Sequence, residues 1–520
     1  MSLRGRRSGL AVGAISLGCP KNLVDTEVML GLLDQAGFAV VADPQQAQER
    51  AEPGRAGLRP VADVILVNTC CFIAPAREEA AEALRQAVRW KQRGSAKTVI
   101  CAGCWPQAAL AELQECFPEV DAFMGPDQVP QVVSVVQQAL AGLRPQPLVC
   151  SSPTYLYDDT TPRLRATPLW TAYLKIAEGC SHRCAFCVIP RLRGRYRCRR
   201  LSSVVAEAER LAAEGVVEVN LVAQDTTAYR DEESGAAIAD LLAALARTEG
   251  LRWVRLLYGF PTRVTKRLIG TMAREPVVCK YLDLPFQHAD REILHRMGRP
   301  GEGAGYLRLI ADLRAAMPDI AIRSSFLVGF PGEGEGEFQR LLEFVEAAQL
   351  DRVGAFCFSR EPGTPAADMP DQVPAELAHE RYHRLMSLQQ GISLARNQRW
   401  VGRDLEVLVE WRGQRQGEWV GRSFRDAPDI DGTVVVRSNR RLQIPRAQPV
   451  AEPAEGGPPL GDPEGPLGVL NGPSRPPEGG LGRQRSADTG LAAGRLAKVK
   501  VTNAGPYDLA GTVSNLAAQG

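Results

Sequence analysis

Short apolar segments alternate with amphipathic, helix-like segments through the first 395 residues of the chain. Such alternation predicts βα units, in which helices cover a sheet of parallel strands. In a first series, the predicted strands and helices occupy in turn residues 11–17, 22–36, 61–68, 75–93, 98–102 and 106–116. This series predicts an N-terminal parallel α/β domain over 9–145.

A second series of the same kind begins near residue 170. Its predicted strands are 173–177, 217–223, 253–258, 281–284, 320–328 and 353–358, each separated from the next by a helical pattern. Six βα units without a dinucleotide-binding fingerprint are typical of an open or partial (β/α) barrel of the TIM type. We expect this barrel over 169–395, joined to the first domain by a proline-rich linker over 146–168.

Beyond residue 395 the pattern changes to short alternating strands, which predicts a small C-terminal β-barrel over 396–520. The expected strands are 405–411, 432–436, 496–501 and 509–513. They are interrupted at 447–494 by a stretch rich in proline and glycine that lacks aromatic residues. Such a composition buries too little surface to order itself, so we expect a disordered insertion there.

Composition places the chain among globular proteins without a membrane segment. It is 45% hydrophobic and 23% charged, with 62 basic and 60 acidic side chains. No apolar run approaches the roughly 18 residues that cross a bilayer. The thirteen cysteines are an odd number, which fits a closed disulfide framework poorly. Reduced thiols or metal ligands explain them better, and both predict a reducing, cytoplasmic location.

Three of the cysteines form a C-x₃-C-x₂-C motif directly after a predicted barrel strand: Cys180, Cys184 and Cys187. A structural zinc site needs four ligands, and His182 is too close to both flanking cysteines to serve as a comfortable fourth. A [4Fe-4S] cluster held by three thiolates instead leaves one iron open to a substrate. The motif therefore favours an iron–sulfur cluster over a zinc knuckle.

A second set of cysteines lies in the N-terminal domain, where Cys19, Cys70 and Cys104 each follow a predicted strand. The carboxyl ends of parallel strands meet along one edge of a sheet, so these three thiols can converge and hold a second cluster. Spacing does not exclude Cys71 or Cys101 as alternative ligands. The other cysteines lack partners at ligand spacing and are interpreted as structural: Cys116, Cys150, Cys198, Cys279 and Cys357.

The motif at 180–187, with the aromatic Phe186 before its last cysteine, resembles that of radical S-adenosylmethionine (SAM) enzymes. In that family the open iron binds SAM, and one electron from the cluster releases a 5′-deoxyadenosyl radical. The three domains together resemble the methylthiotransferases, which implies two [4Fe-4S] clusters, SAM, and a TRAM-like C-terminal barrel.

The methylthiotransferases divide into enzymes that modify tRNA adenosine and enzymes that modify an aspartate of small-subunit ribosomal protein S-twelve. Four short segments resemble the ribosomal-protein branch: Ser-Leu-Gly-Cys-Pro-Lys-Asn-Leu-Val-Asp at 16–25, Lys-Ile-Ala-Glu-Gly-Cys at 175–180, Ala-Gln-Asp-Thr-Thr at 223–227 and Leu-Pro-Phe-Gln-His at 284–288. A tRNA methylthiotransferase is the alternative, and a non-enzymatic, metal-stabilised RNA-binding protein is a more distant one.

The resemblance implies β-methylthiolation, in which one SAM supplies the methyl group and a second supplies the radical. A radical is required because an unactivated C–H bond offers no acidic proton to a general base. Polar residues near predicted strand ends could line the SAM pocket or be ordinary polar residues of the barrel mouth: Gln224, Asp225, Gln287, His288, Arg323 and Ser324. Catalytic residues beyond the cluster ligands stay unassigned.

Charge is unevenly distributed in the C-terminal part. Residues 396–446 and 495–520 carry fourteen basic and eight acidic side chains, whereas the expected insertion carries three basic and six acidic. A basic small barrel suggests contact with RNA, here ribosomal RNA around the target protein. The partners implied are ribosomal protein S-twelve or the small subunit, and a one-electron reductant such as a flavodoxin.

Overall fold

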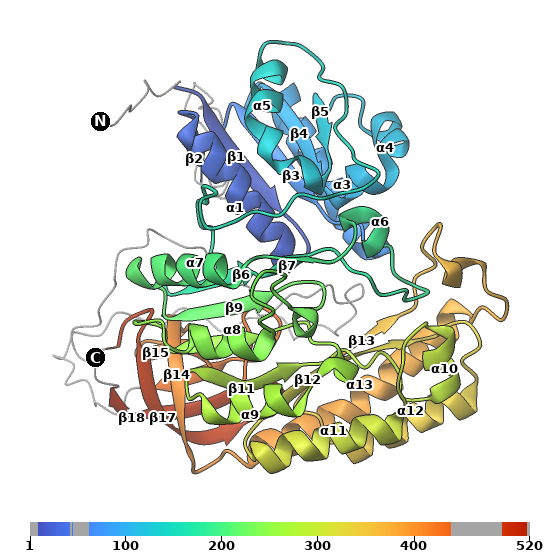
Figure 1. The fold of residues 1–520 in the computed structure, drawn as a ribbon, viewed down its shortest axis with the longest axis vertical. Helices are drawn as coiled ribbons and strands as arrows, with labels where there is room; N and C mark the ends of the chain where they lie inside the picture. Colours follow the sequence, from blue (N-terminus) through green and yellow to red (C-terminus); the bar gives the residue numbers. More distant parts are fainter. Residues whose placement is uncertain (1–8, 42–43, 45–61, 438–490, 517–520) are drawn as a thin grey trace, which may run out of the picture. The chain divides into compact units, whose positions relative to one another are not determined.

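The computed structural model describes residues 9–41, 44, 62–437 and 491–516 (Figure 1). The chain divides into two compact units, residues 1–393 and 394–520. Among the described residues, no helix is long and apolar enough to cross a membrane.

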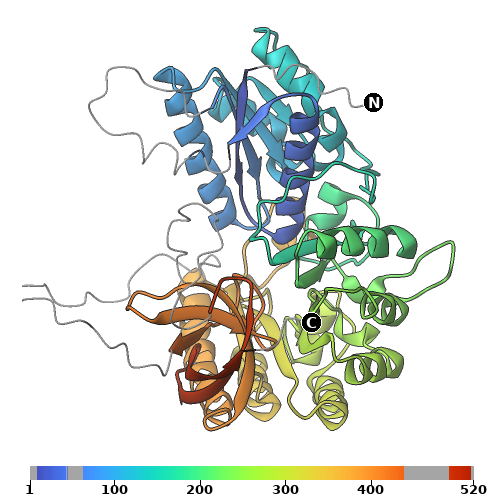
Figure 2. The ribbon, with the colours of Figure 1, turned by 90° about the vertical axis from the view of Figure 1, so that its left-hand side faces the viewer.

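The first unit begins with a parallel sheet in the strand order β2-β1-β3-β4-β5. Its strands are β1 (Ala11–Ser16), β2 (Ala39–Val41), β3 (Val64–Thr69), β4 (Thr98–Gly103) and β5 (Ala122–Met124). The helices of this domain are α1 (Pro20–Gln35), α3 (Ala74–Gln92), α4 (Cys104–Cys116) and α5 (Val132–Leu140), and they cover both faces of the sheet (Figure 2). Every residue of β3 and β4 is buried, as expected for central strands of a covered parallel sheet. The predicted α/β domain is confirmed.

The same unit continues with a six-stranded parallel sheet in the order β13-β12-β11-β10-β9-β6. The strands are β6 (Thr171–Lys175), β9 (Glu218–Val222), β10 (Trp253–Leu256), β11 (Val278–Asp283), β12 (Ala321–Val328) and β13 (Arg352–Cys357). The helices between them are α7 (Leu201–Ala213), α8 (Ile238–Leu245), α9 (Lys266–Arg274), α10 (Arg291–Arg296), α11 (Gly303–Ala316) and α12 (Glu335–Ala348). Strands β6 and β13 lie at opposite ends of this order, so the barrel is open, as predicted.

The proline-rich stretch between the two sheets is anchored rather than loose. Arg163 is buried and forms ion pairs with Glu27 of α1 (2.6 Å) and Glu207 of α7 (2.8 Å). Tyr157 is also buried, and the Arg199 guanidinium lies 4.3 Å from its ring centroid. The predicted linker therefore packs against both domains of the first unit.

The second unit is a closed barrel in the order β14-β15-β16-β18-β17. The strands are β14 (Asp404–Arg412), β15 (Glu418–Ser423), β16 (Val434–Arg437), β17 (Leu496–Ala504) and β18 (Leu509–Leu516), and helix α13 (Ala375–Gln398) precedes them. The sequence did not predict β15. The expected insertion at 447–494 lies outside the described residues except for 491–494, and there Leu491 belongs to the barrel core. The barrel therefore resumes by residue 491, earlier than the expected boundary at 495.

Candidate functional site

The C-x₃-C-x₂-C motif forms one loop between β7 (Ala177–Glu178) and α6 (Ile189–Arg193). Cys180, Cys184 and Cys187 are all partly exposed. The Cys180 amide donates to the Gly194 carbonyl (3.1 Å), and the Cys187 amide donates to the Cys184 carbonyl (3.1 Å). Gly179 has a φ of +79°, and a Cβ there would collide with the Arg195 backbone. The loop is thus folded tightly, with its three thiols partly open to a ligand.

The surroundings of this loop disfavour free thiolates. Burial raises the pKa of Cys180 to about 11 and that of Cys187 to about 12, and the neighbouring Cys184 adds to both shifts. The Arg299 guanidinium lies 3.8 Å from the Cys184 sulfur. Thiols of this kind stay protonated until a metal displaces the proton. Soft thiolate donors beside a fixed cation suit an iron–sulfur cluster.

His182 has other partners than a metal. Its Nε2 lies 2.7 Å from Asp225 Oδ2, and its ring stacks on Phe260 at 4.0 Å between centroids. Within the described part of the chain, no three Cys, His, Asp or Glu side chains converge closely enough for a single metal ion. Each thiolate of a four-iron cluster binds a different iron, so ligands of a cluster lie further apart. The contacts of His182 weigh against its role as the fourth ligand of a zinc ion.

The structure also brings Cys19, Cys70 and Cys104 together at the carboxyl edge of the N-terminal sheet. Cys19 precedes α1, Cys70 follows β3, and Cys104 begins α4 directly after β4. Burial, together with the neighbouring Cys104 and Cys19, raises the pKa of Cys70 to about 12. Burial also opposes ionisation of Cys19, but the charges of Lys21 and Arg193 outweigh it and hold its pKa below the ordinary value.

Two glycines allow these three loops to converge. Gly18 has a φ of +82°, and a Cβ on it would lie 2.5 Å from the Cys70 Cβ. Gly103 has a φ of +97°, and a Cβ on it would collide with the Asn68 side chain and the Thr69 backbone. Each position therefore requires glycine both for its backbone conformation and for the space beside it.

The two alternative ligands differ in position. Cys101 lies within β4 and is 0% exposed in the core of the sheet. Burial raises its pKa, and no other thiol contributes to that shift. Cys71 is also buried, but Cys104 and Cys70 are close enough to raise its pKa further. Cys71 thus lies beside the triad, and Cys101 does not.

Replacing Gly18 by alanine is expected to displace Cys70. If each triad holds a cluster, as the sequence predicts, the iron bound after anaerobic reconstitution should fall by about half. Gly94→Ala is a matched control, because Gly94 also has a positive φ (+75°) but faces open space. Both variants incur the backbone cost of about 1 kcal/mol. Equal iron contents in the two variants would contradict the proposed role of Gly18.

A ring of four buried charges links the two cysteine loops. Lys175 and Arg193 each contact both Asp25 and Glu178, at 2.7 Å for Lys175–Glu178, 2.8 Å for Arg193–Asp25 and 2.9 Å for Arg193–Glu178. Asp25 comes from α1, and the other three residues come from the barrel and its cysteine loop. The ring is electrically balanced, as burial requires.

Arg193 and the residues before it also reach the N-terminal triad directly. Arg193 donates to the Asn22 side chain (3.1 Å) and lies 3.5 Å from the Cys104 sulfur. Val188, which follows Cys187 directly, and Leu192 pack in the same apolar cluster as Cys104. The segment that leaves the barrel triad therefore ends beside the N-terminal triad.

The residues predicted for a SAM pocket are held by polar contacts of their own. Gln224 donates to Glu178 (2.5 Å), while its own side-chain oxygen is buried without a partner among the described residues. Asp225 caps the short helix at Thr226–Ala228 by accepting from the Ala228 amide (3.1 Å). Gln287 is partly exposed in the loop after β11 and has a φ of +71°. Gln224 and Asp225 lie beside the cysteine loop, where they contact Glu178 and His182.

The other three predicted residues are deeper in the barrel. Arg323 pairs with Asp283 (2.9 Å). Ser324 is fully buried, where it donates to the Leu284 carbonyl (2.8 Å) and accepts from the Phe286 amide (3.1 Å). His288 is also fully buried, and its Nδ1 accepts from the Asp290 amide (3.0 Å). In these positions Ser324 and His288 fix the loop after β11.

Several residues of the site were not predicted from the sequence. Glu178 lies two residues before the first motif cysteine, and this proximity could have marked it as a residue of the site. Arg299 comes from the turn after α10, and its guanidinium also lies 4.3 Å from the Phe260 ring centroid. Nothing in the spacing of Arg193 or Arg299 marks them, because their partners are distant in the sequence.

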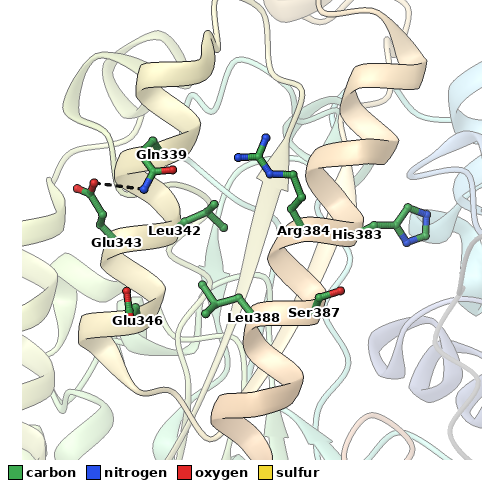
Figure 3. A pocket seen from close by; sticks show the side chains of 8 residues that line it. All are labelled: Gln339, Leu342, Glu343, Glu346, His383, Arg384, Ser387 and Leu388. Atoms are coloured by element: carbon green, nitrogen blue, oxygen red, sulfur yellow. Dashed lines mark hydrogen bonds between the residues drawn. The ribbon is translucent and has the colours of Figure 1, made fainter.

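A surface hollow lies between α12 and α13 (Figure 3). The hollow is lined by Gln339, Leu342, Glu343, Glu346, His383, Arg384, Ser387 and Leu388. None of these is a cysteine or a predicted site residue. Shape alone does not mark the cysteine site, which is defined by its thiols.

Comparison with known families supports this division of the chain. Residues 174–345 match the Radical SAM superfamily, residues 55–125 match the uncharacterized protein family UPF0004, and residues 401–451 match the TRAM domain. The solved structure of the radical SAM methyltransferase TsrM from Kitasatospora setae, with tryptophan substrate and a SAM analogue bound, superposes with a TM-score of 0.51. It is 19% identical and covers 69% of this chain and 75% of its own, which shows a shared fold.

Curated relatives match over most of the chain. Ribosomal protein uS12 methylthiotransferase RimO of Heliobacterium modesticaldum is 47% identical over 444 residues, which is 85% of this chain and 93% of the relative. The enzyme of the same name from Moorella thermoacetica is 48% identical over 83% of this chain and 94% of its own length. The chain therefore belongs to the ribosomal protein uS12 methylthiotransferase RimO family.

Proposed function

We propose that this chain transfers a methylthio group to the β-carbon of an aspartate in ribosomal protein uS12. As a family member it is a radical SAM methylthiotransferase, which implies SAM and a [4Fe-4S] cluster. The observation that carries the proposal is the convergence of the two thiol triads: the segment after Cys187 packs beside Cys104. An enzyme that both activates a C–H bond and delivers sulfur needs two such centres close together.

In this proposal Cys180, Cys184 and Cys187 hold the cluster that binds SAM, and Cys19, Cys70 and Cys104 hold a second cluster. When bound, the first cluster and SAM supply the radical and the second cluster supplies the sulfur. Arg299 fixes a positive charge beside Cys184. Gln224, Asp225, Gln287 and Arg323 are proposed to contact SAM, with Ser324 and His288 holding their loop.

The C-terminal barrel is proposed to touch ribosomal RNA near the target. On β17, Lys498 and Lys500 are both exposed, and on β14 the Arg412 guanidinium lies 5.3 Å from the Trp419 ring centroid. Exposed cations suit the phosphate backbone of RNA, whereas Trp419 is buried in the barrel core and offers no surface for a base to stack on. We also propose that the protein is cytoplasmic and that a flavodoxin-like protein donates the single electron.

Intact-mass analysis of uS12, combined with nucleoside analysis of tRNA from the same cells, tests the proposed function. Deleting the gene is expected to remove the methylthio mass from uS12 and to leave the methylthio-adenosines of tRNA unchanged. Restoring the wild-type chain should restore the uS12 mass. Loss of a methylthio-adenosine with unchanged uS12 would instead assign the chain to the tRNA branch.

A further inference from the structure

Lys21 is a buried cation at the junction between the N-terminal triad and the barrel mouth. It lies two residues after Cys19, in the first turn of α1, and its side chain is only 7% exposed. Its ammonium nitrogen lies 3.3 Å from the centroid of the Tyr258 ring. Tyr258 follows β10 in the barrel, so this contact joins the two domains at the site.

Tyr258 is held in an unfavourable conformation to make this contact. Its φ is +58°, a region that a tyrosine rarely adopts. The Asp283 carboxylate accepts from its amide (3.1 Å) and holds the backbone there. Strain that is held in place by a specific contact is typical of functional sites.

The charge of Lys21 is balanced differently from that of its buried neighbours. Lys175 and Arg193 share the carboxylates of Asp25 and Glu178. Within the described ranges no ion pair connects Lys21 to a carboxylate; its neighbours are the Tyr258 ring and the Cys19 thiol, whose pKa its charge lowers. A buried ammonium with an aromatic ring but no carboxylate can still accept an anion, because pairing offsets the cost of burying both charges.

We propose that Lys21 binds the side-chain carboxylate of the target aspartate and thereby selects and positions it. This inference rests on the proposed function, since the substrate carries the required anion. The reacting β-carbon is bonded directly to that carboxylate carbon. A carboxylate held by Lys21 would therefore place the β-carbon between the Cys19 triad and the barrel mouth. Arg193 is less suited, because Asp25, Glu178, Asn22 and Cys104 already surround its guanidinium.

The test compares two substrates on the same reconstituted holoenzyme: uS12 with its target aspartate, and uS12 with asparagine at that position. The wild-type enzyme is expected to prefer the aspartate substrate by at least about tenfold in kcat/KM, since a charge-assisted contact is lost with asparagine. In Lys21→Met this preference should fall to near one, and Lys21→Arg should restore part of it. Lys91→Met is the control, because Lys91 pairs with Asp121 elsewhere in the N-terminal domain.

A ratio of two substrates does not depend on how much of a variant folds or binds iron. A preference that is unchanged in Lys21→Met would overturn the inference. If the rates with both substrates had also fallen by the same factor, Lys21 would be a counter-ion of the neighbouring cluster. Absence of any product from uS12 with the wild-type enzyme would contradict the proposed function itself. The two failures are therefore distinguishable.

Discussion

Alanine in place of Cys180, Cys184 or Cys187 is expected to abolish formation of 5′-deoxyadenosine. Alanine in place of Cys19, Cys70 or Cys104 is expected to leave that reaction and to stop methylthio transfer. The reason is the separation of the triads into two loops, one in the barrel and one at the edge of the N-terminal sheet. Loss of one of three thiolates leaves a cluster without its full set of protein ligands.

Both products are measured on each reconstituted variant: 5′-deoxyadenosine by chromatography and modified uS12 by intact mass. Iron content shows whether each variant has lost one cluster or both. Cys116→Ala is the matched control, because Cys116 is exposed at the end of α4 and belongs to neither triad. Equal loss of 5′-deoxyadenosine in both sets of variants would refute the proposed division of roles.

Most strands of the two parallel sheets were predictable because the central strands bury a continuous apolar run on both faces. The three-residue strands β2 and β5 were not predicted. Strand β15 was missed for a physical reason. Its sequence, Glu-Trp-Val-Gly-Arg-Ser at 418–423, mixes polar residues with a central glycine, which usually weakens a strand. In the barrel Gly421 is needed, because a Cβ there would collide with the Leu408 carbonyl of β14.

The positions of the two cysteine triads were predictable because these cysteines follow strand ends, and strand ends can be read from the local sequence. The charged residues between the triads were not. Lys175 and Asp25 are 150 positions apart, and each alone resembles an ordinary charge on a helix or strand. Only the fold shows that they meet, so the sequence singled out the two sets of cysteines and missed the charged residues that connect them.

The ring of Asp25, Lys175, Glu178 and Arg193 is expected to produce the second large effect. Lys175→Met leaves two buried carboxylates facing one cation, which is expected to lower the free energy of unfolding by about 3–5 kcal/mol. Urea denaturation of the metal-free protein measures this without interference from iron. Arg85→Gln serves as control, since Arg85 pairs with exposed Glu82 and its loss should change stability by less than about 0.5 kcal/mol.

Removing one charge of each sign tests whether the ring acts as a unit. Lys175→Met combined with Asp25→Asn leaves Arg193 paired with Glu178 at 2.9 Å, so the buried charge is balanced again. The free energy of unfolding lost in the double variant should be about 1–3 kcal/mol smaller than the sum of the losses in the two single variants. Additive costs would mean that the four charges stabilise the protein independently.

The position of the ring between the two domains of the first unit adds a second readout. Arg163 is a trypsin site that is buried by Glu27 on one domain and Glu207 on the other. If Lys175→Met loosens the contact between the domains, trypsin should cut after Arg163 faster than in the wild-type protein, at urea concentrations below the unfolding transition. If cleavage is unchanged while stability falls strongly, the lost free energy of unfolding arises within one domain. The ring would then not hold the two cysteine loops together.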